Sequence, residues 1–379
     1  MNGLPFAQRG APVLPASMAE ALALVRRGEL QRASSLLMKG LHGGAERAEP
    51  ASGPHTAAAR FSRSDIEDVD DIRATSTAQV WPRAPAHTQG RARFSSVAFR
   101  HGGADHPFHL YVPASAAPPA GRAVILMLHG CTQDAQDFAQ GTRMNAQAER
   151  AGALVLYPTQ QRAANHNGCW NWFRPEDQRA GAGEPALLLA MLGHVMATEA
   201  VDPRRAYVAG LSAGGAMAAV LAREYPEVFA AVGVHSGLAA GAAHNMMGAL
   251  SAMRSGAKGD APGTQGGGDP AVPLIVFHGD RDTTVHPRNG EQLLGAAVLR
   301  GMTETQSGHS GDGQRYTRTL VRSSDTKTVQ AEHWLLHGAG HAWSGGDARG
   351  SHASATGVNA SQEMLRFFME RPRVDKSSL

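Results

Sequence analysis

The pattern of apolar and polar residues changes near residue 91. From there, short apolar runs alternate with segments that have a helical period. Six of the runs are almost continuously apolar: AVILMLHG, ALVLYP, RAYVAGLS, AAVGVHSG, PLIVFHGD and EHWLLHGAG. Runs of this kind are typical of strands that are buried on both faces of a parallel sheet.

The segments between these runs complete the prediction of fold class. ARFSSVAF and FHLYVP predict an opening antiparallel pair, and helical periods occur in ALLLAMLGHVMATEA, GGAMAAVLAREYP and SQEMLRFFMER. Strands that alternate with helices predict an α/β domain with a mostly parallel, doubly wound sheet. We expect this domain to span residues 91–372, followed by a short tail at 373–379. Ligands of such sheets bind beyond the carboxyl ends of the strands.

The first 90 residues have a different character. Residues 16–41 carry apolar residues at helical spacing, interrupted at Gly28, and predict two short helices within an N-terminal extension of residues 1–42. It could cap the main domain or bind an apolar granule or partner surface. Residues 43–90 lack sustained periodicity and predict a flexible linker. A second stretch of this composition, residues 255–270, predicts an exposed loop.

Charge and hydropathy exclude some classes of function. The net charge is only +3 over 379 residues, and no basic block contains interleaved aromatic residues, which argues against nucleic-acid binding. No apolar run approaches the roughly 18 residues that span a bilayer. Pro12, Pro15 and Glu20 interrupt the apolar positions near the N-terminus, which therefore does not resemble a secretory signal.

The two cysteines are Cys131 and Cys169. Two buried thiols would suit a reducing compartment, whereas one disulfide would need an oxidising one. Neither residue belongs to a CxxC pair, so their spacing leaves both possibilities open.

A nucleophile motif lies at the end of one predicted strand. Gly210-Leu211-Ser212-Ala213-Gly214 matches G-x-S-x-G, with the strand AYVAG before it and the helix GGAMAAVLAREY after it. In this setting the chain turns sharply at the serine, and only glycine fits at the crowded flanks. Because a serine hydroxyl needs a base to remove its proton, Ser212 predicts acid and histidine partners later in the chain.

Two aspartates and two histidines compete for these roles. Asp280 and Asp282 follow the strand PLIVFH, and we favour Asp282 because it lies deeper in the loop. His341 is favoured as the base over His337, which is still within its strand. His333 extends these histidines into a row at four-residue spacing, but the strand-like context argues against a metal site.

The developing negative charge on an ester carbonyl needs two backbone N–H donors. We expect one from Ala213, directly after the nucleophile, and one from Cys131 in the loop after AVILMLHG. A structural role is favoured for His129 over a role as catalytic acid.

Five motifs in order carry a resemblance to a known family: LMLHGCTQDAQDFA, NHNGCWNWF, VDPRRAYVAGLSAGGAMAAVLA, FHGDRDTTVHP and HWLLHGAGHAWSGG. Over about residues 92–371 the sequence resembles type 1 poly(3-hydroxybutyrate) depolymerases, the short-chain polyhydroxyalkanoate depolymerase family. Feruloyl and acetylxylan esterases are its nearer relatives. The resemblance implies an α/β-hydrolase fold and a serine esterase that needs no metal or organic cofactor.

The same resemblance assigns individual residues. It implies a catalytic triad of Ser212, Asp282 and His341 and a disulfide that joins Cys131 to Cys169. It also places Trp170 and Trp172 near the ester-binding cleft, where ordinary core packing is the alternative.

The sequence departs from the family in two ways. We recognise no substrate-binding domain after residue 372 and no secretion signal, so soluble oligomers or small esters are alternatives to polymer. The family suggests an extracellular enzyme, and a cytoplasmic one is the alternative. The rival functions are a feruloyl or acetylxylan-type esterase and a noncatalytic protein that binds polyester granules.

Overall fold

The computed structural model describes residues 90–257, 272–295, 301–324 and 326–373. The predicted helical extension and almost all of the predicted linker lie outside these residues. So does most of the predicted loop at 255–270.

The domain is built on one ten-stranded sheet in the order β1-β4-β6-β5-β7-β8-β9-β12-β11-β10. The six strands from β6 to β12 in this order are parallel, and they are the six continuously apolar runs of the sequence. Antiparallel strands extend the sheet at both edges. This confirms the predicted mostly parallel sheet and the opening antiparallel pair. The strands are β1 Arg93–Val97, β4 Phe108–Val112, β5 Arg122–Leu128, β6 Leu154–Pro158, β7 Val201–Leu211, β8 Ala231–His235, β9 Leu274–Gly279, β10 Gly301–His309, β11 Arg315–Ser323 and β12 Val329–Leu336.

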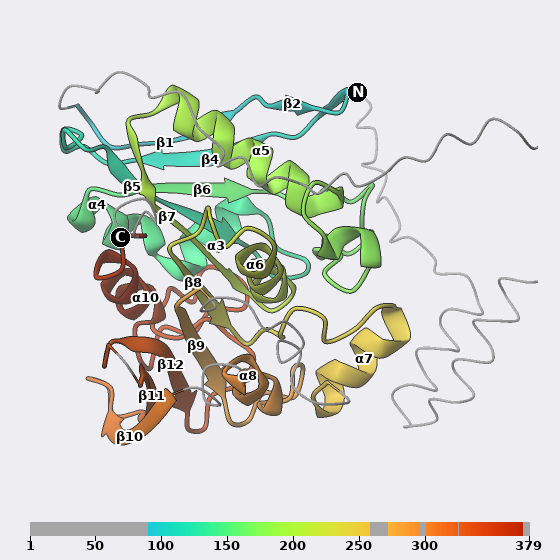
Figure 1. Ribbon diagram of the computed structural model, residues 1–379, viewed down its shortest axis with the longest axis vertical. Coiled ribbons are helices and arrows are strands. Elements are labelled where there is room, and N and C mark those ends of the chain that lie inside the picture. The colour runs from blue at the N-terminus through green and yellow to red at the C-terminus, as the bar shows by residue number, and fades with distance from the viewer. Residues whose placement is uncertain (1–89, 258–271, 296–300, 325, 374–379) are drawn as a thin grey trace, which may run out of the picture. The chain divides into compact units, whose positions relative to one another are not determined.

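Helices cover both faces of the sheet (Figure 1). One layer includes α5 (Gly183–Thr198) and α6 (Ala213–Glu224), and the opposite layer holds α3 (Ala135–Thr142), α4 (Met144–Ala151) and α10 (Ala360–Met369). The remaining elements are the two-stranded β2 (Arg100–His101) and β3 (Ala104–Asp105), η1 (Pro175–Gln178), α7 (Met246–Ser255) and α8 (Arg288–Leu293). The three predicted helices correspond to α5, α6 and α10.

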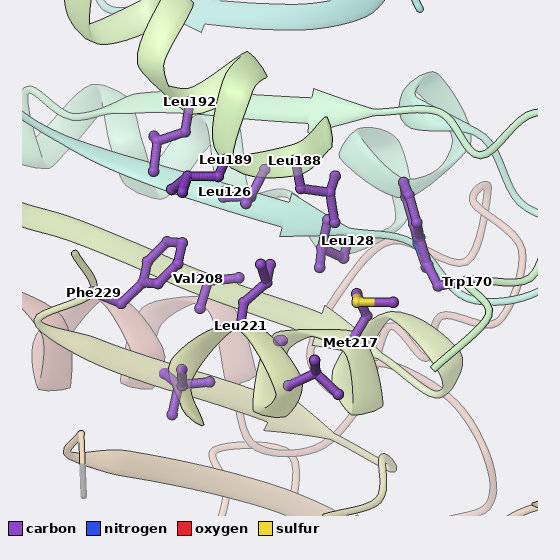
Figure 2. Packing of buried hydrophobic residues seen from close by; sticks show 14 of the residues in the cluster. Leu126, Leu128, Trp170, Leu188, Leu189, Leu192, Val208, Met217, Leu221 and Phe229 are labelled. Carbon is purple, nitrogen blue, oxygen red and sulfur yellow. The ribbon is translucent and has the colours of Figure 1, made fainter. Parts of the chain in front are cut away.

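Figure 2 shows the core beneath α5 and α6. Leu126 and Val208 from the sheet pack against Leu188 of α5 and Leu221 of α6, and all four are fully buried. Full burial of each such side chain stabilises the fold by roughly 2 kcal/mol. The helix α6 is thereby held against β5 and β7, which fixes the turn at its N-terminus where Ser212 lies.

The parallel strands bring several loops to one edge of the sheet. Because β5, β7, β8, β9 and β12 run in the same direction, the residues that follow them leave the sheet at the same edge. No helix among the described residues is both long and apolar enough to cross a membrane.

Candidate active site

Ser212 occupies a sharp turn between β7 and α6. The strand ends at Leu211 and the helix begins at Ala213, while Ser212 has φ 56° and ψ −118°. A positive φ is strained for a residue with a side chain, and such strain is concentrated at functional positions. The Ser212 N–H donates to the His235 carbonyl at the end of β8 (2.9 Å), which ties the turn to the neighbouring strand.

The flanking glycines explain the motif. A Cβ on Gly210 would lie 2.3 Å from the backbone of Gly214, and a Cβ on Gly214 would lie 2.1 Å from the Leu128 carbonyl oxygen. Real side chains do not approach so closely, so a methyl group at either position would push α6 away from β5 and β7. The spacing G-x-S-x-G therefore reflects the contact that positions Ser212.

Asp282 and His341 form a hydrogen-bonded pair at the same edge of the sheet. His341 Nδ1 lies 2.7 Å from Asp282 Oδ2. The other oxygen of Asp282 accepts the N–H groups of Thr284 (2.9 Å) and Val285 (2.8 Å). Burial would raise the pKa of Asp282, but the contacts with His278 and His341 hold it far below its ordinary value. The carboxylate stays ionised and fixes the imidazole through Nδ1, which leaves Nε2 to act on a substrate or nucleophile.

The competing residues form a separate pair. His337 Nδ1 lies 2.9 Å from Asp280 Oδ2, and the Gly338 N–H donates to Asp280 Oδ1 (2.7 Å). Asp280 is exposed, whereas Asp282 is only 6% exposed. The Asp280–His337 pair fastens the turn before the loop that carries His341.

No hydrogen bond joins Ser212 to His341 among the residues that the structure describes. In unliganded enzymes this contact is often long and shortens when substrate binds. The two residues follow β7 and β12, whose carboxyl ends lie at one edge of the sheet. His235 lies between these elements, because its carbonyl accepts the Ser212 N–H and its ring Nε2 accepts the Ser344 N–H, three residues after His341.

Two buried histidines beneath the pair were missed by the sequence reasoning. His235 is fully buried, accepts the Ser344 N–H at Nε2 (3.1 Å) and has a pKa lowered to about 3 by burial and by repulsion from His278 and His341. His278 Nε2 lies 2.8 Å from the Val285 carbonyl and 3.5 Å from Asp282 Oδ2. Both follow apolar runs, as HSG and HGD, and this position was the available signal.

The two expected oxyanion donors are free. Within the described residues, neither the Cys131 N–H nor the Ala213 N–H donates to a protein acceptor. The adjacent Gly130 N–H is occupied by Gln133 Oε1 (2.9 Å). His129 is fully buried and accepts the Gln160 N–H at Nε2 (3.0 Å), an arrangement that supports the structural role predicted for it.

A disulfide and a hydrogen bond connect the loop that contains Trp170 and Trp172 to this site. Cys131 and Cys169 form a disulfide, which confirms the pairing that the family resemblance implies. Trp170 is 1% exposed, packs among the core leucines (Figure 2) and donates from Nε1 to the His129 carbonyl (3.1 Å). Trp172 is also buried and contacts Phe173 edge-on. Substrate binding by these two tryptophans stays a prediction.

Comparison with known families adds to this geometry. The family model described as "Esterase PHB depolymerase" matches residues 106–315, more than half of the chain. The chain belongs to this family. The matched segment includes Ser212 and Asp282 and ends before His341.

Individual esterases are similar to parts of the chain. Poly(3-hydroxyalkanoate) depolymerase C of Paucimonas lemoignei is 36% identical over 46% of this chain and 44% of its own length. Feruloyl esterase B of Thermothelomyces thermophilus is 32% identical over 49% of this chain and 67% of its own. The chain spans about half the length of the curated depolymerases it matches.

A solved structure supports the fold. The acetyl xylan esterase from Aspergillus awamori superposes with a TM-score of 0.53 at 20% identity, over 66% of this chain and 94% of that one. At this identity the likeness concerns the fold alone, and it agrees with an α/β-hydrolase arrangement of sheet and helices.

Proposed function

We propose that this member of the esterase family hydrolyses carboxylic esters through an acyl-enzyme on Ser212. The Ser212 Oγ attacks the ester carbonyl while His341 Nε2 takes its proton, and Asp282 stabilises the resulting imidazolium. The N–H groups of Cys131 and Ala213 bind the oxyanion of the tetrahedral intermediate. His341 returns the proton to the leaving alcohol, and water then cleaves the acyl-enzyme by the same steps.

One observation carries this proposal. A serine in a strained turn lies at the same edge of the sheet as a buried Asp–His pair, next to two backbone N–H groups that donate to no acceptor among the described residues. A noncatalytic granule-binding protein would need none of these features. The acyl-transfer reaction uses each of them.

We propose poly(3-hydroxybutyrate) or its oligomers as the substrate class. The family description and the depolymerase of Paucimonas lemoignei support a hydroxyalkanoate ester. Feruloyl or acetylxylan esters are the second candidate, because Thermothelomyces feruloyl esterase B also matches this chain. All three ester classes fit the same acyl-transfer site, so the distinction lies in groups that contact the acyl chain.

A direct comparison of substrates tests this proposal. Purified protein would be assayed for release of acid from poly(3-hydroxybutyrate) film, hydroxybutyrate oligomers, methyl ferulate and acetylated xylan, with Ser212→Ala as the matched control. We expect the highest kcat/KM on hydroxybutyrate oligomers and no turnover by the variant. A preference of at least tenfold for ferulate or acetyl esters would replace the substrate assignment, and inactivity on every ester would overturn the proposed reaction.

We also propose an extracytoplasmic location. The Cys131–Cys169 disulfide supports it, because such bonds persist in oxidising compartments. Fractionation of cells that produce the protein, with antibody detection, tests this directly. Recovery in the cytosol with two free thiols would contradict it.

A further inference from the structure

Glu184 is a buried carboxyl group outside the proposed triad. It lies in the first turn of α5 and is 8% exposed. Its Oε1 accepts hydrogen bonds from the side-chain amides of Gln160 and Asn171, and its Oε2 accepts the Asn171 backbone N–H at 2.7 Å. All three neighbouring groups are donors, which matches the acceptor-only character of an ionised carboxylate. A proton on Oε1 would compete with one of its two bonds, and a proton on either oxygen would remove the negative charge that strengthens all three bonds.

Both partners of Glu184 are linked by hydrogen bonds to the oxyanion loop, residues 129–131, which presents the Cys131 N–H. Gln160 donates its backbone N–H to His129 Nε2 (3.0 Å) and its side-chain amide to the Cys169 carbonyl (3.1 Å). Cys169 is bonded to Cys131 through the disulfide.

A second set of contacts connects Glu184 to the oxyanion loop through Asn171. The residue before it, Trp170, donates from Nε1 to the His129 carbonyl (3.1 Å). Both sets of contacts therefore end at residues 129–131, the segment that presents the Cys131 N–H. Movement of the Glu184 partners would displace that donor.

The charge of Glu184 is sensitive to pH. Burial and the nearby negative charge of Asp177 raise the pKa of Glu184 to about 7, against the lowering effect of the bonds from Asn171 and Gln160. Asp177 Oδ1 accepts the Glu184 N–H (2.8 Å). A cavity of about 280 Å³ borders Glu184, and its other charged or titratable lining groups are His106, Arg174, Glu176 and Asp177. His129, reached through Gln160, is kept neutral because burial lowers its pKa.

We propose that ionised Glu184 is a positioning residue that holds the oxyanion loop in its productive place, and that protonation of Glu184 loosens this loop. The inference rests on the proposed esterase reaction. It assigns Glu184 no contact with substrate.

This role predicts opposite effects of pH on activity and stability. The ionised form of Glu184 supports activity, so activity should rise as the pH rises through about 7. The folded-state pKa of Glu184 lies above its ordinary value of 4.5, so the folded protein binds more protons than the unfolded chain between these values. The contribution of Glu184 to stability is therefore present below about pH 4.5 and is lost as the pH rises through about 7. A residue with a purely structural role would change activity and stability in the same direction.

The test compares Glu184→Gln with Glu176→Gln, a matched change at an exposed residue of the same cavity. For each variant, kcat, KM and thermal unfolding would be measured from pH 5 to 9 on a soluble ester that the wild type hydrolyses. At pH 8 we expect Glu184→Gln to lower kcat on the order of tenfold with KM within about twofold, because a displaced oxyanion donor weakens transition-state binding. The acid limb of log kcat/KM should also lose a proton-linked step of about tenfold, because the variant has no carboxyl at this position to titrate. The Tm difference between variant and wild type should shift in favour of the variant as pH rises, and Glu176→Gln should match the wild type throughout.

Each outcome is decisive. An unchanged pH profile in a folded, active Glu184→Gln overturns the inference and leaves the proposed reaction intact. A wild type without esterase activity overturns the reaction and this inference together. If Glu184→Gln does not fold, Glu184→Asp replaces it. This variant keeps a titratable carboxyl with a shorter reach, so it should lower kcat and retain the proton-linked step in the acid limb, and loss of that step would contradict the inference.

Discussion

Asp282 and His341 lie 59 residues apart in sequence and are joined by a 2.7 Å hydrogen bond between Oδ2 and Nδ1. The bond links the loop after β9 to the loop after β12, two strands that are paired in parallel. Asp280 and His337 form a second bond only two residues before Asp282 and four before His341. The two pairs differ in burial. The contribution of each pair to activity can be measured by substituting its own aspartate.

The first prediction concerns these two aspartates. Asp282→Asn should lower kcat on the order of 10⁴-fold, because an amide cannot hold the required imidazole tautomer and cannot stabilise an imidazolium. Asp280→Asn should lower it by less than about tenfold. Steady-state kinetics on a soluble ester measures both effects. The reverse ranking would assign the acid role to Asp280.

The second prediction concerns acid stability. The pKa of His235 is lowered to about 3 by burial, so the unfolded chain binds more protons than the folded protein between about pH 3 and 6.5. This group's contribution is fully present above about pH 6.5 and is lost as the pH falls toward 3. Urea unfolding across this range should show a smaller decline in the free energy of unfolding for His235→Asn than for the wild type. Equal declines would show that protonation of His235 does not limit acid stability, whatever the absolute stability of the variant.

The third prediction concerns the disulfide. The bond closes a loop with a sequence separation of 38, which corresponds to about 4 kcal/mol in the chain-entropy model. Reduction should lower the Tm and also kcat, because the bond holds the Cys131 N–H in place. Intact mass under native conditions should be about two hydrogens below that of the reduced protein. Two titratable thiols in the native protein, or turnover unaffected by complete reduction, would count against this role.

The fourth prediction concerns the glycine beside the nucleophile. Gly214→Ala would place a Cβ 2.1 Å from the Leu128 carbonyl oxygen, so α6 must shift. We expect a loss of at least about 2 kcal/mol in stability and a loss of activity. Gly311→Ala is the control, because a Cβ there meets no atom within 4 Å. Chemical denaturation of the two variants measures the difference, and equal stabilities would show that the contact at Gly214 relaxes without cost.

The sequence predicted the elements whose environment leaves a clear pattern. The runs that became β5 to β9 and β12 are buried on both faces and are therefore continuously apolar. The antiparallel pair β10 and β11 was missed, because β10 is almost entirely exposed and has no apolar periodicity to recognise. The short helices α3 and α4 were also missed.

The sequence allowed the candidate site to be predicted where the place of a residue after a strand indicates its role. Ser212, Asp282 and His341 each follow a predicted strand, and the structure places all three at one edge of the sheet. The Cys131–Cys169 bond was predicted from the family resemblance, because the spacing of the two cysteines alone was equally compatible with two free thiols. The network around Glu184 could not be predicted, because it depends on contacts between residues 13 and 24 positions apart whose polar side chains carry no pattern.

The most direct test of the central claim is covalent labelling of the nucleophile. A fluorophosphonate probe reacts with a serine whose hydroxyl is activated by an adjacent base. Peptide mass spectrometry of the labelled wild type should locate the adduct on Ser212, and Ser212→Ala should remain folded, unlabelled and inactive on esters. Labelling at another residue, or turnover by Ser212→Ala within about tenfold of the wild type, would contradict the account.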